Sequence, residues 1–238
     1  MSHPDSSHLR DEYPKLPKNP FPGIRPYTAA EDSVFFGREN QVQPILELLS
    51  CNHLVTVTGA SACGKSSLLN AGIVPLLRDG LYGDHSLIVS LTPGKDPFRA
   101  FAEAFTEVAG AWVDEKTLEF KSLESLMEAS GLAPERPVIV IVDQFEEVFR
   151  LIEDLDTDES PGGPDSPIQG PFRTSAFSEV QNFTQFLSGI PEMEQGYLVI
   201  GIRADFLKDC SRFKCMAEII GKSIYITSLL SRHDLEFA

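Results

Sequence analysis

Short apolar runs alternate along the chain with segments whose apolar residues recur every three or four positions. The runs cover residues 54–58, 86–91, 137–142, 196–203 and 223–227, and helical spacing follows in segments such as 67–77 and 98–108. Runs rich in β-branched residues are typical of strands buried on both faces, and the intervening helical segments favour parallel pairing. The pattern therefore predicts an α/β fold, with helices on both faces of a parallel five-stranded sheet.

Further helices are expected around these units. They cover residues 28–36, the stretch that follows 35–39, and residues 112–129, 175–188 and 206–220, and another starts near residue 231. Thr28 and Glu31 form a capping box at the start of the first. Pro44 either kinks the second helix or sits near its first turn.

Three segments break the periodic pattern. Residues 1–18 mix Pro, Ser, His and charge, which predicts a disordered tail. Residues 19–27 are too proline-rich for a helix and too apolar for a linker, so we expect them to lie extended against the domain. The acidic stretch 153–172 predicts a mobile surface insertion, either a partner-binding loop or a solvated loop without a special role, and the second is favoured. The expected organisation is the tail, an N-terminal segment 19–50 and a core 51–238.

The stretch Gly59–Ser66 fits the pattern G-x-x-x-x-G-K-[ST] between a predicted strand and a predicted helix, which is the context of a P-loop. Glycines let the backbone N–H groups surround an anion, and the helix dipole adds positive potential there. Lys65 would reach the β- and γ-phosphates, and the Ser66 hydroxyl would ligate Mg²⁺. The candidate phosphate-binding residues are Gly59, Ala62, Cys63, Gly64, Lys65, Ser66 and Ser67.

Carboxylates follow the apolar run that ends at residue 142. Asp143 stands where a P-loop protein needs its metal-holding acid, so Ser66 and Asp143 are the candidate metal ligands. Glu146 and Glu147 lie within one turn of the strand end, and one of them would orient the attacking water, because the residue directly after Asp143 is a glutamine. The alternative is an ordinary acidic helix start.

Arg203 ends the run 196–203 and would lie beside the γ-phosphate, where an arginine senses whether that phosphate is present. Asp205 either pairs with Arg203 or caps the helix that follows, and the cap is favoured. The candidate catalytic residues are Lys65, Glu146, Glu147 and Arg203.

Composition narrows the function classes. The 238 residues carry a net charge of −15 and no Lys/Arg-rich run, so a nucleic-acid-binding footprint is missing. The polar N-terminus and the lack of an apolar stretch of about 18 residues exclude a signal peptide and a membrane span, and we expect a cytoplasmic protein. Four cysteines without a C-x-x-C pair suggest separate thiols, and oxidation of Cys63 as a regulatory event is the less favoured alternative.

Several strings occur together in the order seen in STAND NTPases. They are Phe35-Phe36-Gly37-Arg38-Glu39, the P-loop, Asp143-Gln144-Phe145-Glu146-Glu147 and Arg203-Ala204-Asp205-Phe206. The chain most resembles the bacterial novel-STAND group, whose opening segment is similar to residues 19–27. The spacing of Asp143, Glu146 and Glu147 also resembles the acidic box of NACHT ATPases.

This resemblance implies a three-layer P-loop NTPase with sheet order 5-1-4-3-2 and a switch between ADP-bound and ATP-bound states. It places Gly37 and Arg38 near the adenine and ribose, and Arg203 as the sensor of the γ-phosphate. Family members usually carry a winged-helix lid and C-terminal sensor repeats. We find neither in this chain and expect a fragment or a truncated product, whose protein partners act through such domains and which assembles as an ATP-dependent homo-oligomer.

The leading hypothesis is thus an ATP/ADP-binding switch domain that uses Mg²⁺ and hydrolyses ATP slowly. One alternative is a non-hydrolysing scaffold in which the nucleotide only stabilises the fold. A second is a small-molecule P-loop kinase, which is disfavoured because no Arg-rich acceptor lid follows the core.

Overall fold

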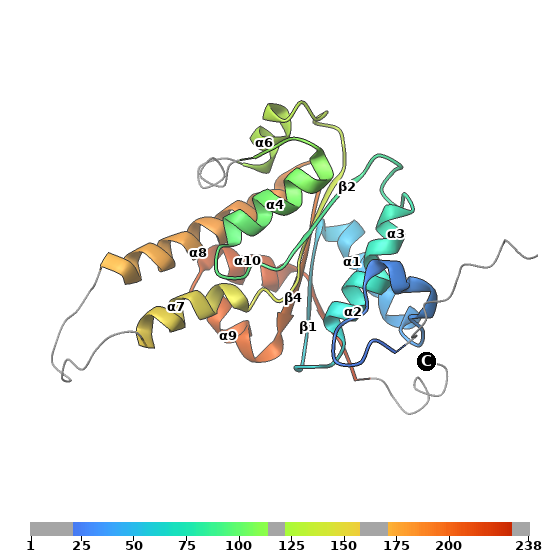
Figure 1. Ribbon diagram of the computed structural model, residues 1–238, viewed down its shortest axis with the longest axis horizontal. Helices are drawn as coiled ribbons and strands as arrows, with labels where there is room; N and C mark the ends of the chain where they lie inside the picture. The colour runs from blue at the N-terminus through green and yellow to red at the C-terminus, as the bar shows by residue number, and fades with distance from the viewer. Residues whose placement is uncertain (1–20, 114–121, 158–170, 230–238) are drawn as a thin grey trace, which may run out of the picture.

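The computed structural model describes residues 21–113, 122–157 and 171–229. In these residues five parallel strands form one sheet in the order β2-β3-β4-β1-β5, which is the expected order counted from the opposite edge (Figure 1). The strands are β1 (Leu54–Gly59), β2 (Leu87–Leu91), β3 (Val138–Val142), β4 (Gly196–Arg203) and β5 (Ile224–Ile226). The predicted α/β fold with a parallel five-stranded sheet is confirmed.

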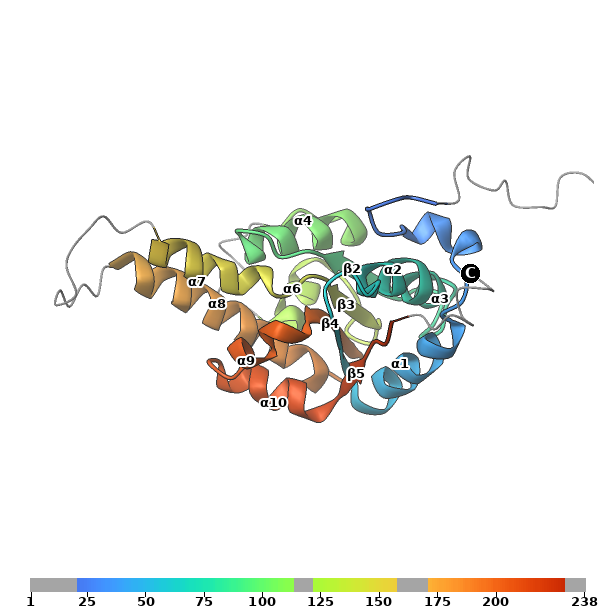
Figure 2. The same ribbon diagram turned by 90° about the horizontal axis from the view of Figure 1, so that it is seen from below.

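Helices cover both faces of this sheet (Figures 1 and 2). One face is covered by α1 (Glu39–Asn52) and by the continuous helical segment made of α2 (Lys65–Ser67), the π-helical turn η3 (Leu68–Ile73) and α3 (Val74–Arg78). The other face is covered by α4 (Pro97–Ala109), α6 (Leu123–Ala129), α7 (Glu147–Thr157), α8 (Pro171–Gly189), α9 (Leu207–Cys210) and α10 (Lys214–Lys222). Short 3₁₀ helices lie at Ala29–Val34 (η2), Ile190–Glu192 (η4) and Ala204–Phe206 (η5).

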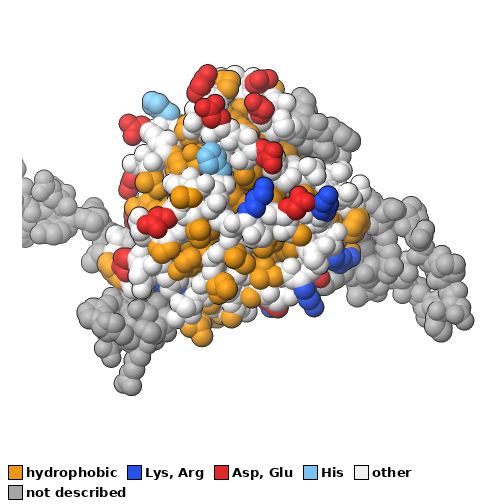
Figure 3. All heavy atoms as spheres, turned by 180° about the vertical axis from the view of Figure 1, so that it is seen from behind, with side chains coloured by type: hydrophobic (Ala, Val, Ile, Leu, Met, Phe, Trp, Pro, Cys, Tyr) orange, Lys and Arg blue, Asp and Glu red, His pale blue; other side chains and the backbone are white. Residues whose placement is uncertain are grey.

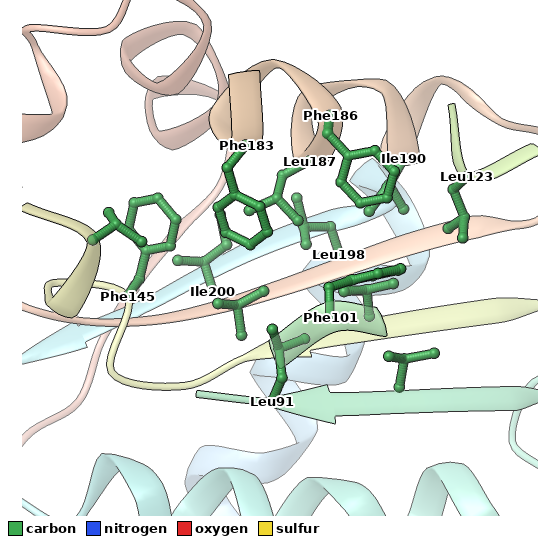
Figure 4. Packing of buried hydrophobic residues seen from close by; sticks show 14 of the residues in the cluster. Leu91, Phe101, Leu123, Phe145, Phe183, Phe186, Leu187, Ile190, Leu198 and Ile200 are labelled. Carbon is green, nitrogen blue, oxygen red and sulfur yellow. The ribbon is translucent and has the colours of Figure 1, made fainter. Parts of the chain in front are cut away.

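Alternate residues of the strands feed two separate cores. In β3, Val138, Val140 and Val142 pack on the side of α4 and α8, whereas Ile139 and Ile141 pack on the side of α1 and η3. The first core is rich in phenylalanine, as the packing of Phe101, Phe183 and Phe186 over the sheet illustrates (Figure 4). Burial on both faces explains why the strands read as uninterrupted apolar runs.

Several element boundaries differ from the expectation. The helix predicted over residues 112–129 is wrong at its start, because Trp112 and Val113 are not helical and Ser122 caps a helix that begins at Leu123. The helix predicted over 206–220 is interrupted between α9 and α10, where Cys210 and Phe213 are buried in the core. Pro44 lies inside α1, which continues through it to Asn52.

The predicted insertion is only partly described. Helix α7 takes in residues 153–157 and α8 takes in 171 and 172, while 158–170 lie outside the described residues. The predicted tail 1–18 and the helix expected near residue 231 also lie outside them. Residues 21–27 contain a turn at Gly23 and run beside the start of α2 (Figure 2).

The register of the sheet brings the polar residues to one edge. Gly59 at the end of β1 lies opposite Arg203 at the end of β4, and Val142 at the end of β3 lies opposite Ile200. Because all strands are parallel, the segments that follow β1, β3 and β4 emerge at this same edge. β5 is the last strand at one edge of the sheet, and its Ile224 and Ile226 side chains are exposed. On the face seen from behind in Figure 3, hydrophobic side chains lie mainly in the lower half.

Candidate functional site

The loop Gly59–Ser66 connects β1 to α2 and contains two residues in the left-handed backbone region, Ala62 (φ 58°) and Gly64 (φ 90°). A non-glycine residue there is uncommon and is held by its surroundings. The side chain of Lys65 is buried and folds back across the loop, where Nζ donates to the carbonyl oxygens of Gly59 (3.1 Å) and Ala60 (2.9 Å). The ammonium group therefore lies at the mouth of the loop, held by carbonyl groups that a stronger acceptor would replace.

Asp143 directly follows β3 and is only 7% exposed. Burial raises the pKa of its carboxyl group, and hydrogen bonds from the Ser66 hydroxyl and the Gln144 N–H (2.9 Å) oppose part of that rise. Beneath it lies Gly201 of β4, where an added Cβ would come within 2.8 Å of Asp143 Oδ1 and 2.7 Å of Leu69 Cδ1. Asp143 and Ser66, which are 77 residues apart in the chain, are thus joined by a hydrogen bond, and any side chain at Gly201 would press on Asp143 from the neighbouring strand.

Glu146 and Glu147 point to different neighbours. Glu146 is buried, and its Oε2 accepts a hydrogen bond from the backbone N–H of Arg203 (3.1 Å), which ties the end of β3 to the end of β4. Glu147 Oε2 instead accepts from the N–H of Gly94 in the β2–α4 connection (3.1 Å). The two carboxylates are therefore distinguished by their partners: Glu146 bonds to the end of β4, and Glu147 bonds to the β2–α4 connection.

Arg203 ends β4 with its guanidinium group paired to Asp205, with Nη2 2.6 Å from Oδ2 and Nε 3.2 Å from Oδ1. The same group lies 5.2 Å from the ring centre of Phe206. This pair lowers the pKa of the Asp205 carboxyl group. The helix cap favoured for Asp205 is wrong: the residue lies inside the 3₁₀ helix η5, and its side chain bonds to Arg203.

A hollow of about 250 Å³, here called the small hollow, lies where these groups meet. Its lining includes Lys65, Ser66, Asp143, Glu146 and Arg203, together with residues that the sequence reasoning did not single out, Pro26, Ser61, Gln144 and Arg150 among them. Arg150 follows Glu146 by four residues, so about one helical turn brings a third cationic side chain to the hollow, beside Lys65 and Arg203. Glu147 is not part of this lining.

Arg38 and Gly37 lie apart from the small hollow. Arg38 is buried, and its guanidinium group donates to the carbonyl oxygen of Cys63 (2.5 Å), to Gln41 Oε1 (3.3 Å) and, at 3.5 Å, to the carbonyl oxygen of Ser228. An added Cβ at Gly64 would meet Arg38 Nη2 at 2.9 Å, and the φ of 90° there is one that L side chains rarely adopt. Arg38 thus supports the Gly59–Ser66 loop from behind, a role that the sequence alone did not indicate.

Three further observations concern metal clusters, cysteines and membrane spans in the part of the chain that the structure describes. Among the residues that the structure describes, no cluster of three or more His, Cys, Asp or Glu side chains is arranged to bind a metal ion. The thiols of Cys51, Cys63, Cys210 and Cys215 are not in disulfides, and burial raises the pKa of the Cys210 thiol to about 12. None of the described helices combines the length and apolarity that a membrane crossing requires.

The sheet order, the loop between β1 and α2 and the acidic segment after β3 define an α/β P-loop NTPase fold. A family model described as Novel STAND NTPase 1 matches residues 20–238, almost the whole chain, and the protein belongs to this family. No curated protein matches the chain. The resemblance to novel-STAND NTPases is thereby confirmed, and the chain is a STAND-type NTPase domain with the nucleotide-binding fold of that class.

Proposed function

We propose that this chain is an ATP/ADP-binding switch domain that hydrolyses ATP slowly with the help of Mg²⁺. The observation that carries the proposal is the convergence of Lys65, Ser66, Asp143, Glu146 and Arg203 on one small hollow at the carboxyl edge of the sheet. Two cations, a hydroxyl and two carboxylates within one recess are the groups that phosphoryl transfer needs. The proposed binding and hydrolysis of ATP need no other residue that lines the small hollow.

Phosphate binding falls to Lys65 and the N–H groups of the Gly59–Ser66 loop. The bonds from Lys65 Nζ to the carbonyl oxygens of Gly59 and Ala60 hold the ammonium group in place, and phosphate oxygens are stronger acceptors for it than neutral carbonyls. The start of α2 at Lys65 adds the partial positive charge of a helix N-terminus.

Ser66 and Asp143 would hold the magnesium ion. Their hydroxyl and carboxylate are hard oxygen donors, and Mg²⁺ in nucleotide sites is held by one or two protein oxygens together with phosphates and water. When bound, the ion would neutralise charge on the phosphates. A nearby cation also favours the ionised form of Asp143, whose burial otherwise raises its pKa.

Glu146 is our choice for the residue that orients the attacking water, because it lines the small hollow and Glu147 does not. Arg203 would read the γ-phosphate by exchanging its bonds with Asp205 for bonds to phosphate oxygens. Such an exchange moves an arginine at the end of β4, which gives the nucleotide a means of changing the surface of the domain. Protein partners and an ATP-dependent homo-oligomer would respond to that change.

The test is nucleotide binding by isothermal titration, with Mg-ATP and Mg-ADP, to the full chain and to Lys65→Ala. We expect micromolar binding by the wild type and at least a hundredfold loss in the variant, since the buried cation is removed from the phosphate site. Lys214→Ala is the matched control, because Lys214 is an exposed lysine paired with Glu218 on α10. Undiminished binding by Lys65→Ala would contradict the proposal.

Hydrolysis is tested separately. The purified protein is incubated with stoichiometric Mg-ATP, and the bound nucleotide is identified by chromatography over several hours. Slow conversion to ADP supports the switch, whereas ATP that persists unchanged favours the scaffold alternative.

A further inference from the structure

The acidic segment 143–147 continues the pairing of β3 after the strand itself has ended. The backbone N–H of Asp143 donates to the carbonyl oxygen of Leu91 at the end of β2 (2.9 Å). Two residues later, the N–H of Phe145 donates to the carbonyl oxygen of Gly201 in β4 (2.9 Å). The segment is therefore bonded to the same two strands that flank β3 in the sheet.

The two glutamates of this segment add a side-chain bond on each side. Glu146 Oε2 accepts from the N–H of Arg203, the last residue of β4, and Glu147 Oε2 accepts from the N–H of Gly94, which follows β2 (both 3.1 Å). Because the sheet order is β2-β3-β4, these bonds point in opposite directions. The carboxylates thus take the place of strand backbone beyond the end of β3.

The bond of Glu147 also fixes the start of a helix. Glu147 is the first residue of α7, and Glu146 directly precedes it. The turn that leads into α7 passes through Gln144, which is exposed and has a left-handed backbone (φ 53°). Phe145 anchors this turn in the core, edge-on to Phe149 (Figure 4). A segment held on one side can pivot about its attachment, whereas bonds on both sides remove that freedom.

We propose that Glu147 is a positioning residue: its bond to Gly94 holds Glu146 where that carboxylate orients the attacking water. The inference rests on the proposed hydrolysis and gives a role to the glutamate that does not line the small hollow. Glu147 acts through the length of its side chain and its acceptor oxygen, and takes no proton from the water. Displacing a catalytic group by about 1 Å can slow a reaction up to about a hundredfold, so such support has a measurable effect on the rate.

The test compares Glu147→Gln, Glu147→Asp and Glu147→Ala by single-turnover ATP cleavage and by isothermal titration with Mg-ATP. Gln keeps the length and an acceptor oxygen, so its rate should stay within threefold of the wild type. Asp is one methylene shorter and Ala has no acceptor, so both should cleave about tenfold more slowly. All three should bind ATP within twofold of the wild type.

A glutamate that accepted a proton would give the opposite order, because Asp keeps a carboxylate and Gln does not. Glu103→Ala is the matched control, since Glu103 is an exposed glutamate paired with Arg99 on α4, and it should cleave ATP at the wild-type rate.

A second measurement reads the bond itself, without ATP. Hydrogen exchange of the Gly94 amide is followed by NMR in the wild type and the three variants. We expect exchange about tenfold faster in the Asp and Ala variants, which lose one hydrogen bond to that amide, and near the wild-type rate in the Gln variant.

The inference is overturned if the Gln variant cleaves as slowly as the Ala variant, if the Asp and Ala variants cleave like the wild type, or if Gly94 exchanges equally in all four proteins. A wild type that cleaves no ATP would refute the proposed hydrolysis, and this inference with it. A wild type that cleaves ATP while the variants rank differently refutes the role of Glu147 alone, so the two failures are distinguishable.

Discussion

The ends of β1 and β3 lie at the same edge of the sheet but carry opposite chemistry. Both strands are completely buried along their lengths. The segment after β1 turns through Ala62 and Gly64 and presents Lys65, whereas the segment after β3 turns through Gln144 (φ 53°) and presents Asp143 and Glu146. In the proposed function, the first end would hold the phosphates and the second would hold the metal ion and the attacking water.

Because the two ends differ in this way, the strand that lies between them, β4, is also part of the candidate site. β4 pairs with both β1 and β3, gives Asp143 its space through Gly201, and places the N–H of Arg203 on Glu146. The ends of β1 and β3 are therefore held at a fixed spacing by β4, together with the hydrogen bond from Ser66 to Asp143. Substitutions at each end and in β4 can therefore measure separately what each part contributes to ATP cleavage, stability and nucleotide binding.

The largest expected effect separates the two glutamates at the β3 end. Glu146→Gln should slow single-turnover ATP cleavage by about a hundredfold, because the side chain in the small hollow loses its ability to accept a proton from water. Glu147→Gln should slow it by less than threefold, since that residue bonds to Gly94. Quenched-flow measurement of both variants decides the point. If both cleave ATP at the wild-type rate, neither glutamate orients the water.

The next effect concerns β4. Gly201→Ala should lower the free energy of unfolding by about 1–3 kcal/mol, the usual cost of overpacking, because the new methyl group meets Asp143 and Leu69. Denaturant titration monitored by circular dichroism gives the value. Gly221→Ala in α10 is the control: its Cβ meets nothing within 4 Å, so alanine there should be neutral or slightly stabilising. Equal stability of the two variants would show that β4 tolerates a side chain beneath Asp143.

Asp143→Asn tests the cation-binding end. The variant should keep nucleotide binding through Lys65 but lose its dependence on Mg²⁺, since asparagine is a weaker ligand than a carboxylate. A tenfold loss of Mg-ATP affinity would reduce the stabilisation by saturating nucleotide by about 1.4 kcal/mol. Thermal unfolding with and without Mg²⁺ measures it. Identical Mg²⁺ dependence in wild type and variant would remove Asp143 from the proposed metal site.

The smallest effect concerns the pair between Arg203 and Asp205. Because this pair lowers the folded-state pKa of Asp205, its stabilisation is present at neutral pH and is lost as the pH falls below the ordinary aspartate value, about 4. The difference in stability between wild type and Asp205→Asn should therefore be small at pH 7 and shrink towards zero as the pH falls through the lowered pKa of Asp205. The variant also releases Arg203, and we expect ATP affinity to rise about two- to fivefold. Unchanged or weaker ATP binding would argue against a competition between Asp205 and phosphate for Arg203.

Much of the fold was predictable because the strands are buried on both faces. The runs that end at Gly59, Val142 and Arg203 therefore read as continuous apolar sequence. The proximity of the Gly59–Ser66 loop to Asp143 was predictable because both follow buried parallel strands and therefore emerge at the same edge of the sheet. The break between α9 and α10 was not predictable, because Cys210 and Phe213 would be apolar core residues in one continuous helix as well as in two short ones. Only the packing of the folded chain determines where the helix is interrupted.

Other parts of the site depend on contacts between distant segments. Nothing in the local sequence marks Gly201 as a residue beneath Asp143, because the constraint comes from the neighbouring strand and from η3. Arg150 could have been found by counting one helical turn from Glu146. The position of residues 21–27 beside Ser67 and the burial of Arg38 behind Cys63 could be seen only in the three-dimensional arrangement.

The single side chain of Arg38 joins three parts of the chain that are far apart in sequence. Its guanidinium group touches α1 through Gln41, the Gly59–Ser66 loop through Cys63, and the backbone after β5 through Ser228. A guanidinium group is planar and rigid, so a shift of the loop carbonyl changes the geometry of all three bonds together. Arg38 therefore links the chain that leaves the sheet after β5 to the Gly59–Ser66 loop, so that a displacement of the loop would be passed to the backbone around Ser228.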